Sequence, residues 1–475
     1  MKNLSILDEA KNAATSFAER VGGLFSPTVR LGVTGLSRAG KTVFITALVH
    51  TLLNAAPLPL FEPLRAGRIR RVWLQPHPDA HVPRFAYEEH IAALTAGADR
   101  RWPQSTRQIA QLRLVVDYEP AGWLGRNLHG GRLNIDIVDY PGEWLLDLPL
   151  LDMDFAEWSA AALTRAAENG RAALAQDWLA FTNSLDDQAP FDEQTAQQAA
   201  KLYRDYLLAC RDHPGHFSAL QPGRFLMPGD LAGSPLLTFA PLPAGDGPLW
   251  REMRRRYDAY VARVARPFFY DHFARIDRQL VLVDALTALN GGAAAVKDLK
   301  AALTSVLACF RAGSSGLFSR RAERILFAAT RADLIHHSQH DRLKDILALL
   351  VEEAARQATF HGARIETEAI AALRATREGE VTQGGDTLPV IIGVPEKGER
   401  IAGKTFDGKT EAAIFPGDLP AAPHDAVSGA LEGHLNIVHF RPPPLERPKP
   451  LGALPAFPHI RLDAALQFLI ADDLT

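Results

Sequence analysis

Residues 35–42 read Gly35-Leu36-Ser37-Arg38-Ala39-Gly40-Lys41-Thr42, which fits the pattern G-x-x-x-x-G-K-[ST]. Residues 29–34 before it alternate as a strand does, and residues 43–49 after it carry apolar side chains at helical spacing. A loop of this kind between a strand and a helix wraps a phosphate with its backbone N–H groups, and the helix N-terminus adds partial positive charge. The stretch therefore predicts an α/β fold that binds a nucleoside triphosphate.

The pattern also predicts what individual residues of this loop do. Lys41 is expected to reach the outer phosphates, and the hydroxyl of Thr42 to bind Mg²⁺. The residues expected to contact the nucleotide here are Ser37, Arg38, Ala39, Gly40, Lys41, Thr42 and Val43.

The same pattern occurs twice more, at residues 398–405 and 403–410, where the two copies overlap. Neither copy is followed by a helical run. Instead, Asp407-Gly408 lies between short alternating segments, which predicts a hairpin turn. We therefore interpret these copies as a solvated turn and not as phosphate sites.

Composition limits the class of protein. The chain has 475 residues, of which 47% are hydrophobic, and a formal net charge of -3, so two or three structural units are expected and nucleic-acid binding is not favoured. Cys210 and Cys309 stand far apart without a CxxC pattern, which predicts buried thiols in a reducing compartment and no disulfide framework or cysteine zinc site.

No stretch approaches the ~18 to 20 apolar residues of a membrane span, and the N-terminus lacks the apolar region of a signal peptide. A cytoplasmic protein is therefore expected. Residues 1–27 are predicted to contain an amphipathic helix, which either packs on its own domain or lies on a membrane or a partner protein, with the first favoured because its polar face carries both charges.

A second motif, Asp139-Tyr140-Pro141-Gly142, follows the strand-like run of residues 133–138 and fits D-x-x-G. Asp139 is expected to hold Mg²⁺ through water, and the N–H of Gly142 to bond the γ-phosphate. The alternative is a solvated turn at a strand end. Its position downstream of the phosphate-binding loop favours the first interpretation.

Base selection is predicted at Thr330-Arg331-Ala332-Asp333, which follows the buried strand of residues 324–329 and resembles [NT]-K-x-D. The Asp333 carboxylate is expected to accept bonds from the guanine N1–H and the exocyclic amine, which favours GTP over ATP. Arg331 replaces the usual lysine, and its aliphatic stem is expected to lie over the base. The alternative for Asp333 is to cap a helix.

Two further loops complete the predicted site. Residues 362–370 alternate like the last core strand and lead into Ala371-Ala372-Leu373, where the backbone of Ala372 and Leu373 is expected to contact guanine; residues 374–376 are the alternative. Thr106, in the loop before the strand of residues 109–116, is the preferred threonine for closing over Mg²⁺, against a capping or surface hydroxyl.

The spacing of these motifs predicts the architecture. A missing core strand fits residues 277–284, so the fold class is α/β: a P-loop GTPase core, with a mostly parallel sheet and helices on both faces, a large mainly helical insertion and a C-terminal β-containing extension. The predicted parts are an N-terminal amphipathic helix (1–27), the first half of the core (28–144), the insertion (145–276), the second half of the core (277–385) and the extension (386–475).

Smaller features are expected within these parts. Strands are predicted at residues 388–394, 412–415 and 435–440, and a final helix at residues 463–470. The arginine-rich residues 251–266 are interpreted as a solvated helix face, with acidic lipid, RNA or a protein partner as alternatives.

Taken together, these motifs make the chain resemble the YcjX-like family of bacterial GTP-binding proteins. The resemblance extends over nearly the whole length and rests on Asp139-Tyr140-Pro141-Gly142-Glu143-Trp144, Thr330-Arg331-Ala332-Asp333, His336-His337, Trp102-Pro103, Phe406-Asp407-Gly408-Lys409, residues 415–420 and residues 440–443. It implies GTP/GDP and Mg²⁺ as ligands, a role in stress response, and a location near the inner membrane.

The expected chemistry is slow hydrolysis of GTP. Many GTPases place a glutamine after D-x-x-G to orient water, whereas Glu143 adds repulsion near the γ-phosphate. Besides Lys41, Arg38 is a candidate for stabilising the transition state, unless it points to solvent. Two functions fit: a GTPase switch acting on an unidentified protein partner, or a GTP-dependent scaffold or peripheral membrane protein with little turnover. Asp333 disfavours an ATP-using enzyme.

Overall fold

The computed structural model describes residues 26–35, 39–104, 108–121, 131–168, 170–213, 217–312, 322–360, 362–383, 386–428, 431, 433–445 and 455–475. The helix predicted within residues 1–27 and the candidate residues Ser37, Arg38 and Thr106 lie outside these ranges.

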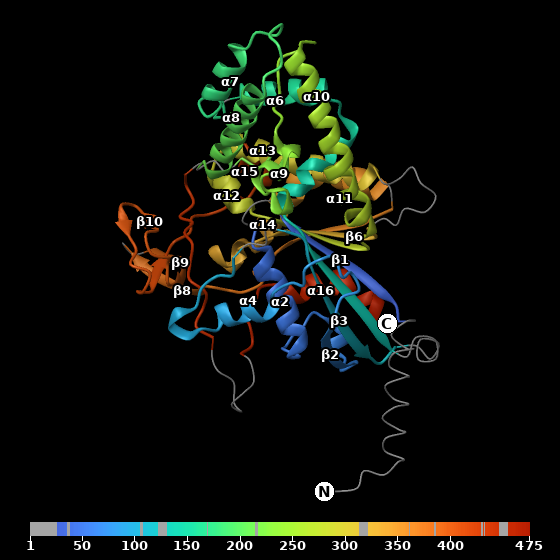
Figure 1. The fold of residues 1–475 in the computed structure, drawn as a ribbon. Helices are drawn as coiled ribbons and strands as arrows, with labels where there is room; N and C mark the ends of the chain where they lie inside the picture. The colour runs from blue at the N-terminus through green and yellow to red at the C-terminus, as the bar shows by residue number, and fades with distance from the viewer. Residues whose placement is uncertain are drawn as a thin grey trace, which may run out of the picture.

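A seven-stranded sheet forms the centre of the molecule, with strand order β2-β3-β4-β1-β5-β6-β7 (Figure 1). From β4 to β7 neighbouring strands are parallel, whereas β3 runs antiparallel to β4 and β2 antiparallel to β3. The strands are β1 (Thr28–Gly35), β2 (Ile69–Gln75), β3 (Ala110–Tyr118), β4 (Arg132–Asp139), β5 (Arg278–Val283), β6 (Arg324–Ala329) and β7 (Arg364–Ala369).

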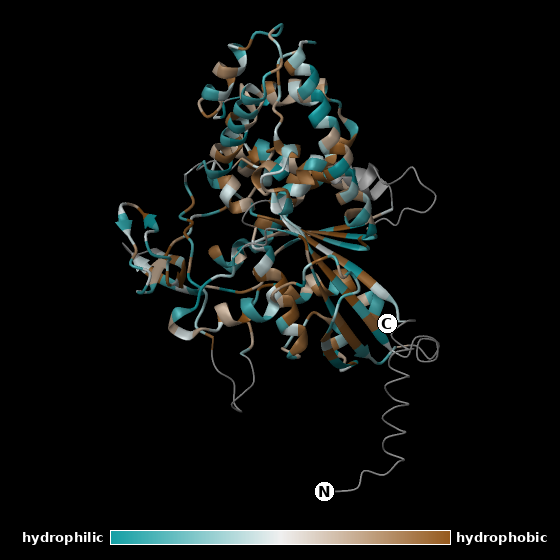
Figure 2. Cartoon of the chain, in the orientation of Figure 1, coloured by the Kyte–Doolittle hydropathy of each residue, from teal (hydrophilic) through white to brown (hydrophobic). Residues whose placement is uncertain are grey.

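The central strands are apolar on both faces because helices cover both sides of the sheet. In β5, Leu280 and Leu282 join one hydrophobic cluster, and Val281 and Val283, whose side chains point the other way, join another. Figure 2 shows the hydrophobic colour concentrated along these strands and in the adjoining helices.

One face is covered by α2 (Lys41–Leu53), which contacts β1, β2 and β4, and by α16 (Leu462–Ile470), which contacts β5 and β6. The final helix therefore packs on the core sheet, although the chain leaves the core after β7. The short helices α3 (Glu62–Arg65) and α4 (Tyr87–Leu94) lie on this side too.

The opposite face is covered by α13 (Ala293–Ala312) and α14 (His340–Phe360), with α12 (Ala285–Asn290) directly after β5. Helices thus lie on both faces of a mostly parallel sheet, and the predicted fold class is confirmed. In the part of the chain that the structure describes, no helix is long and apolar enough to cross a membrane.

The chain between β4 and β5 contains helices and, where it is described, no strand, and much of it forms the upper part of the molecule in Figure 1. It begins with the 3-10 helix η2 (Gly142–Asp152) and ends with η6 (Phe273–Arg275). Between these lie α6 (Phe155–Ala166), α7 (Gln176–Asn183), α8 (Glu193–Asp212), α9 (Gly223–Leu226), α10 (Pro248–Tyr260), the π-helical turn η5 (Val261–Ala265) and α11 (Arg266–Asp271).

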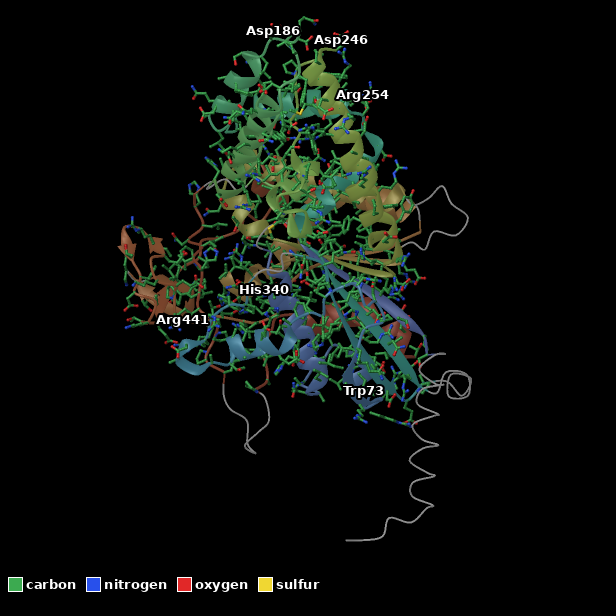
Figure 3. All side chains as sticks on the ribbon, viewed as in Figure 1. Trp73, Asp186, Asp246, Arg254, His340 and Arg441 are labelled. Atoms are coloured by element: carbon green, nitrogen blue, oxygen red, sulfur yellow. The ribbon has the colours of Figure 1, made fainter. Side chains whose placement is uncertain are left out.

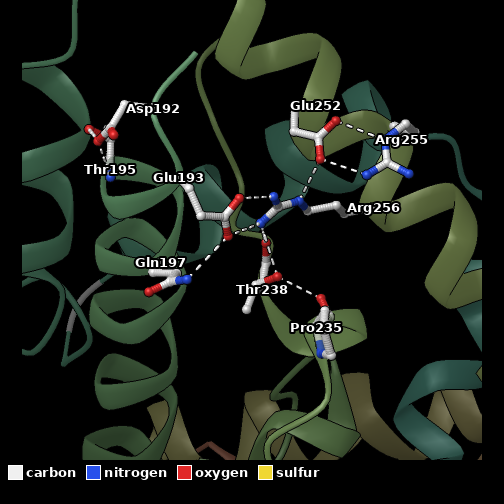
Figure 4. A network of polar contacts seen from close by, with 9 residues as sticks. All are labelled: Asp192, Glu193, Thr195, Gln197, Pro235, Thr238, Glu252, Arg255 and Arg256. Carbon is white, nitrogen blue, oxygen red and sulfur yellow. Dashed lines mark hydrogen bonds and ion pairs between the residues drawn. The ribbon is translucent and has the colours of Figure 1, made fainter.

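The arginines of α10 are paired with acids. Arg256 contacts Glu193 of α8 and Glu252 of its own helix, and Arg255 also contacts Glu252 (Figure 4). Arg254, labelled near the outer end of α10 in Figure 3, lies 3.9 Å from Asp258. A solvated face fits Arg254 and Arg255, which are 59% and 69% exposed, whereas Arg256 is 11% exposed and links α10 to α8.

A small module of strands follows β7. An antiparallel sheet contains β8 (Arg377–Gln383), β9 (Asp386–Gly393) and β12 (Ala412–Ile414), and a hairpin contains β10 (Arg400–Ile401) and β11 (Lys404–Thr405), with α15 (Pro423–Val427) beyond. β8 pairs with β9, so this sheet begins before residue 386.

Two predictions in this module are wrong. Residues 435–440 form no strand: Phe440 makes one isolated bridge to Pro395, bounded by hydrogen bonds from the Glu396 N–H to His439 and from the Arg441 N–H to Val394. The ladder does not continue, because the N–H of Gly398 bonds the carbonyl of Phe406 on one side, and Pro442 and Pro443 lack an N–H on the other. The hairpin turns at Ala402-Gly403, both at positive φ, and not at Asp407-Gly408.

Asp407 instead accepts hydrogen bonds from the N–H groups of Lys409 and Thr410. These two backbone N–H groups are therefore already bonded within the turn, as expected for a turn that does not bind phosphate.

Candidate functional site

A cavity of about 350 Å³ opens at the edge of the sheet where β1, β6 and β7 end. Parallel strands deliver the loops that follow them to one edge, which is where α/β proteins bind ligands. The cavity is lined by residues 39–44, 102–103, 330–331, 333–334, 370–373, 375 and 438–440.

The first wall is the loop and helix start after β1. Gly40 has φ of 80°, in the left-handed region that favours glycine, and its carbonyl accepts the N–H of Phe44 at 2.9 Å to open α2. Nothing lies within 4 Å of a Cβ built on Gly40, so conformation and not space selects glycine here. The N-terminus of α2 thus faces the cavity, an arrangement that suits an anion.

Lys41 and Thr42 are the first two residues of α2. The ammonium of Lys41 donates to the carbonyl of Gly35 at 3.3 Å, so it lies across the loop and beside the cavity. Thr42 is buried, at 6% exposure, and its carbonyl accepts the hydroxyl of Thr46 at 2.7 Å. Ala39 and Val43 also line the cavity, as predicted for contacts with a ligand.

The second wall follows β6 and contains Thr330, Arg331 and Asp333. Asp333 is 6% exposed, and its carboxylate accepts the N–H of Ala375 at 2.8 Å, from the segment after β7. Burial raises the pKa of Asp333 above its ordinary value. Asp333 lies inside the short 3-10 helix η8 (Ala332–Leu334) and bonds another segment, so helix capping does not explain its carboxylate.

Arg331 has an anchor that the sequence analysis did not predict. Its backbone is left-handed, with φ of 60°, and its guanidinium donates to the Asp284 carboxylate and the Thr287 hydroxyl and contacts His439. Although burial alone lowers it, the pKa of Arg331 is raised by Asp284. The pair fixes the guanidinium at the end of β5, and Arg331 lines the cavity.

The third wall follows β7. The N–H of Ile370 bonds the carbonyl of Ala329, and Ala371 pairs with Ile460 through two backbone hydrogen bonds of 3.1 and 2.8 Å. Ala372 and Leu373 come next and line the cavity, as does Ala375 from the alternative segment. Both predicted candidates for this loop therefore reach the same space.

The D-x-x-G residues are not among those that line the cavity. Asp139 is 1% exposed and pairs in register with Val33 of β1, so it lies at the same sheet edge as the loop before α2. Gly142 and Glu143 begin η2 and are buried. A Cβ on Gly223 of α9 would lie 1.7 Å from the carbonyl oxygen of Glu143, so α9 is packed directly against this segment.

Aromatic packing also ties the D-x-x-G segment to the insertion. Tyr140 and Trp144 share a hydrophobic cluster with Phe268 and Phe273. The indole N–H of Trp144 donates to the carbonyl of Met227 at 2.8 Å. A movement of residues 139–144 would therefore be transmitted to the helices of the insertion, because close-packed side chains move together.

A fourth wall combines a loop that the sequence analysis expected near Mg²⁺ with a segment that it did not place there. Trp102 and Pro103, in the loop that leads to Thr106, line the cavity together with Val438, His439 and Phe440. The Trp102 indole N–H donates to the carbonyl of Phe440 at 2.7 Å across 338 residues of sequence.

Arg441, labelled in Figure 3, reinforces this junction by donating to the carbonyls of Ala98 and Gly408 at 2.8 and 3.1 Å. Residues 440–443 did stand out in the family pattern, but no spacing rule in the sequence places them beside the nucleotide motifs.

Comparison with known proteins agrees with the motifs. The chain is 37% identical over 468 residues to a protein of Escherichia coli (strain K12) named Ras-like GTPase YcjX, covering 94% of this chain and 96% of that protein. It is 36% identical over 474 residues to the Ras-like GTPase YcjX of Shewanella oneidensis, covering 94% of each. The profile of the YcjX-like family, DUF463, matches residues 29–474. The resemblance predicted from the motifs is confirmed, and the chain belongs to the YcjX-like family.

Proposed function

We propose that this protein binds GTP and hydrolyses it slowly to GDP and phosphate in a Mg²⁺-dependent reaction, and that it acts as a nucleotide-dependent switch. The observation that carries the proposal is the convergence of three separate motifs on one cavity: the loop before α2, the Asp333 loop and the loop after β7. The relatives named Ras-like GTPase support the same activity.

The phosphates are proposed to lie over the N-terminus of α2. Successive backbone N–H groups from Ser37 to Val43 would donate to them, and the partial positive charge of the helix end favours their negative charge. The Lys41 ammonium, bonded to the Gly35 carbonyl, is close enough to turn toward the β- and γ-phosphates. The Lys41 ammonium would then give up its bond to the Gly35 carbonyl and contact two charged phosphate oxygens. Hydrogen bonds to charged oxygens are stronger, so the nucleotide-bound state would be favoured.

The base is proposed to lie between the Asp333 loop and residues 372–373. A buried carboxylate needs hydrogen-bond donors, and the N1–H and exocyclic amine of guanine supply two side by side, whereas adenine offers no such pair. Thr330 and Arg331 border the same space, as do Ala372 and Leu373, whose backbone is proposed to contact the edge of the base.

Mg²⁺ is proposed to bind at Thr42 and Asp139, with Thr106 joining when GTP is bound. The hydroxyl and carboxylate oxygens of Thr42 and Asp139 match the oxygen donors that this hard cation prefers, and both residues are buried at the same edge of the sheet. The cation would supply charge neutralisation at the phosphates.

Hydrolysis is proposed to be slow because Glu143 occupies the position after D-x-x-G, where many GTPases have a glutamine. A carboxylate accepts a bond from water but cannot also donate to the γ-phosphate, and its charge opposes the phosphate's. The packing of Gly223 against the Glu143 carbonyl further restricts how this segment can approach the nucleotide. Lys41 and Arg38 are proposed to offset the charge of the transition state. A partner protein that repositions residues 139–144 would accelerate the reaction.

Competition binding tests the guanine assignment. Labelled GTP bound to the parent protein should be displaced by GTP and GDP, but by ATP and xanthosine triphosphate only at much higher concentration. Asp333→Asn should weaken GTP binding by about 10-fold to 100-fold, the equivalent of one hydrogen bond to a charged group of ~1.5 to 3 kcal/mol. Equal displacement by all four nucleotides in the parent protein would refute it.

Phosphate release separates the switch from a scaffold that binds GTP without turning it over. The switch requires steady release from GTP that stops when EDTA removes Mg²⁺ and returns when Mg²⁺ is restored. Tight GTP binding with no release, with or without cell membranes and extract, would favour the scaffold instead.

A further inference from the structure

A group of three metal-ligating side chains lies beside the cavity but outside it. His336 and His337 follow the Asp333 loop, and Glu378 is the second residue of β8. One ligand atom from each side chain lies within 4.8 Å of the other two. His337 Nδ1 is 2.6 Å and His336 Nε2 3.7 Å from the same carboxylate oxygen, Oε2 of Glu378.

The carboxylate is held so that this one oxygen faces the two imidazoles. Its other oxygen, Oε1, accepts the backbone N–H of His337 at 3.1 Å and lies 3.3 Å from the guanidinium of Arg374. Glu378 is therefore arranged as a monodentate ligand whose second oxygen is already bonded. Outer partners of this kind orient the ligands in protein metal sites.

The His336 ring is oriented in the same manner. Its Nδ1 lies 2.9 Å from the hydroxyl and 3.4 Å from the backbone N–H of Ser338, and its Nε2 is directed toward Glu378. A metal ion on Nε2 requires the tautomer in which Nδ1–H donates to the Ser338 hydroxyl, so ion binding would displace the contact with the backbone N–H. A metal-binding histidine commonly holds its second nitrogen in a hydrogen bond, because that bond selects the tautomer and fixes the ring. The set thus has three possible ligands and an outer partner for at least two of them.

The spacing suits a cation after a small adjustment. Ligands at ~2.0 to 2.1 Å from a tetrahedral ion are about 3.3 Å apart, so the rings need to move by on the order of 1 Å. His337 is 66% exposed, so solvent borders one side of its ring, whereas His336 and Glu378 are 17% and 24% exposed. The exposed side of His337 leaves room for water as a fourth ligand.

From this geometry we propose that His336, His337 and Glu378 bind a Zn²⁺-class divalent cation. Two imidazole nitrogens and one carboxylate oxygen suit Zn²⁺, whereas Mg²⁺ and Ca²⁺ prefer oxygen alone. The positive charge of Arg374 opposes the ion, so the site is weaker than one built from thiolates. The ion would join the segment after Asp333 to the start of β8.

This position has a structural consequence for the cavity. The same two segments already meet at Asp333, whose carboxylate bonds the N–H of Ala375 and whose carbonyl accepts the hydroxyl of Thr376. His340, labelled in Figure 3, adds a hydrogen bond, since its Nε2 lies 2.9 Å from the carbonyl oxygen of Ala332 on the same loop. Bound Zn²⁺ would therefore stiffen the loop that carries Asp333 without touching the cavity.

The test uses full-length protein without a histidine tag and needs no nucleotide, so it is independent of the proposed GTPase activity. Zn²⁺ binding is measured by competition with a chromogenic chelator, and Zn²⁺-dependent change in melting temperature is followed in parallel. The parent should bind one Zn²⁺ per chain at this site and melt at higher temperature when it is present.

Two variants remove ligands with little risk to folding: His337→Ala, at an exposed position, and Glu378→Gln, which keeps the side-chain volume. Each should weaken Zn²⁺ binding by at least about 100-fold and abolish the shift in melting temperature, since even loss of an outer partner costs about 10-fold to 100-fold. His424→Ala, at an exposed histidine of α15, is the matched control and should bind as the parent does.

Equal Zn²⁺ binding by the parent, His337→Ala and Glu378→Gln would overturn the proposal, and so would a parent that does not compete with the chelator. Binding of Mg²⁺ in place of Zn²⁺ at these residues would contradict the assignment of the cation.

Discussion

Replacing Asp147 should change how the stability of this protein depends on pH. Asp147 is 2% exposed in η2, and its two carboxylate oxygens accept the N–H of Gly223 and the hydroxyl of Tyr260, each at 2.7 Å. Burial raises the pKa of Asp147 from 3.8 to about 6, although these two hydrogen bonds oppose the rise.

The size and sign of the effect follow from this pKa. Between about pH 4 and pH 6 the folded protein keeps a proton that the unfolded chain has already released, so the free energy of unfolding falls as the pH rises. This contribution is fully present below pH 4 and is lost above pH 6. At 1.36 kcal/mol for each pKa unit, the total is about 3 kcal/mol, to order of magnitude.

Asp147→Asn removes the titration and keeps the packing. The amide oxygen can still accept the N–H of Gly223, and the amide N–H₂ can donate to the oxygen of Tyr260. The free energy of unfolding of the variant, relative to that of the parent, should therefore increase by up to about 3 kcal/mol as the pH rises from 4 to 7. Urea unfolding of both proteins, followed by tryptophan fluorescence at several pH values, measures this difference.

Subtracting the free energy of unfolding of the parent from that of the variant at each pH cancels the contributions of the other titrating groups. Burial also raises the pKa of Asp473 to about 6, but it titrates in both proteins and cancels. Tyr260→Phe is a second control: without the hydroxyl that stabilises the charged carboxylate, the pKa of Asp147 should rise further and the loss of stability should extend above pH 6. A difference between Asp147→Asn and parent that stays constant from pH 4 to pH 7 would refute the reasoning.

Three more outcomes are expected. Lys41→Ala should abolish measurable binding of labelled GTP while circular dichroism stays unchanged, whereas Lys404→Ala, in the β10–β11 hairpin, should bind GTP as the parent does. If Lys41→Ala bound GTP with nearly the affinity of the parent, the phosphates would not bind at the loop before α2. Gly223→Ala should destabilise the protein by more than ~3 kcal/mol in urea unfolding, because a Cβ 1.7 Å from the Glu143 carbonyl forces α9 and η2 apart, and an unchanged midpoint would contradict this packing. Cys210 is fully buried and burial raises its pKa to about 11, so native protein at pH 8 should leave it unlabelled by a thiol reagent in peptide mapping, and rapid labelling would show that this core opens.

The sequence by itself determined the core fold and where its ligand loops meet. Gly40, Asp139 and Asp333 each follow a strand-like run, and the ends of parallel strands lie at one edge of a sheet, so local patterns were enough to predict that these loops converge. The helical character between Asp139 and β5 was likewise visible in local composition. These features depend on a few neighbouring residues, which is why a single sequence contains them.

The nucleotide roles of these residues, and the slow hydrolysis expected from Glu143, remain predictions that binding and turnover assays will decide. The position of Glu143 was set by a contact that its own neighbourhood does not reveal, the approach of Gly223 on a helix far along the chain.

Only the tertiary structure decided which distant segments complete the site. Trp102 and Phe440 meet across 338 residues, and Arg331 is anchored by Asp284 from the end of another strand. The strand predicted at residues 435–440 fails because the next donor that a ladder needs, the N–H of Gly398, bonds the carbonyl of Phe406 in the adjoining hairpin. Such contacts depend on how whole helices and strands pack against one another. The packed surfaces are formed by residues far apart in sequence, so no local sequence pattern predicts these contacts.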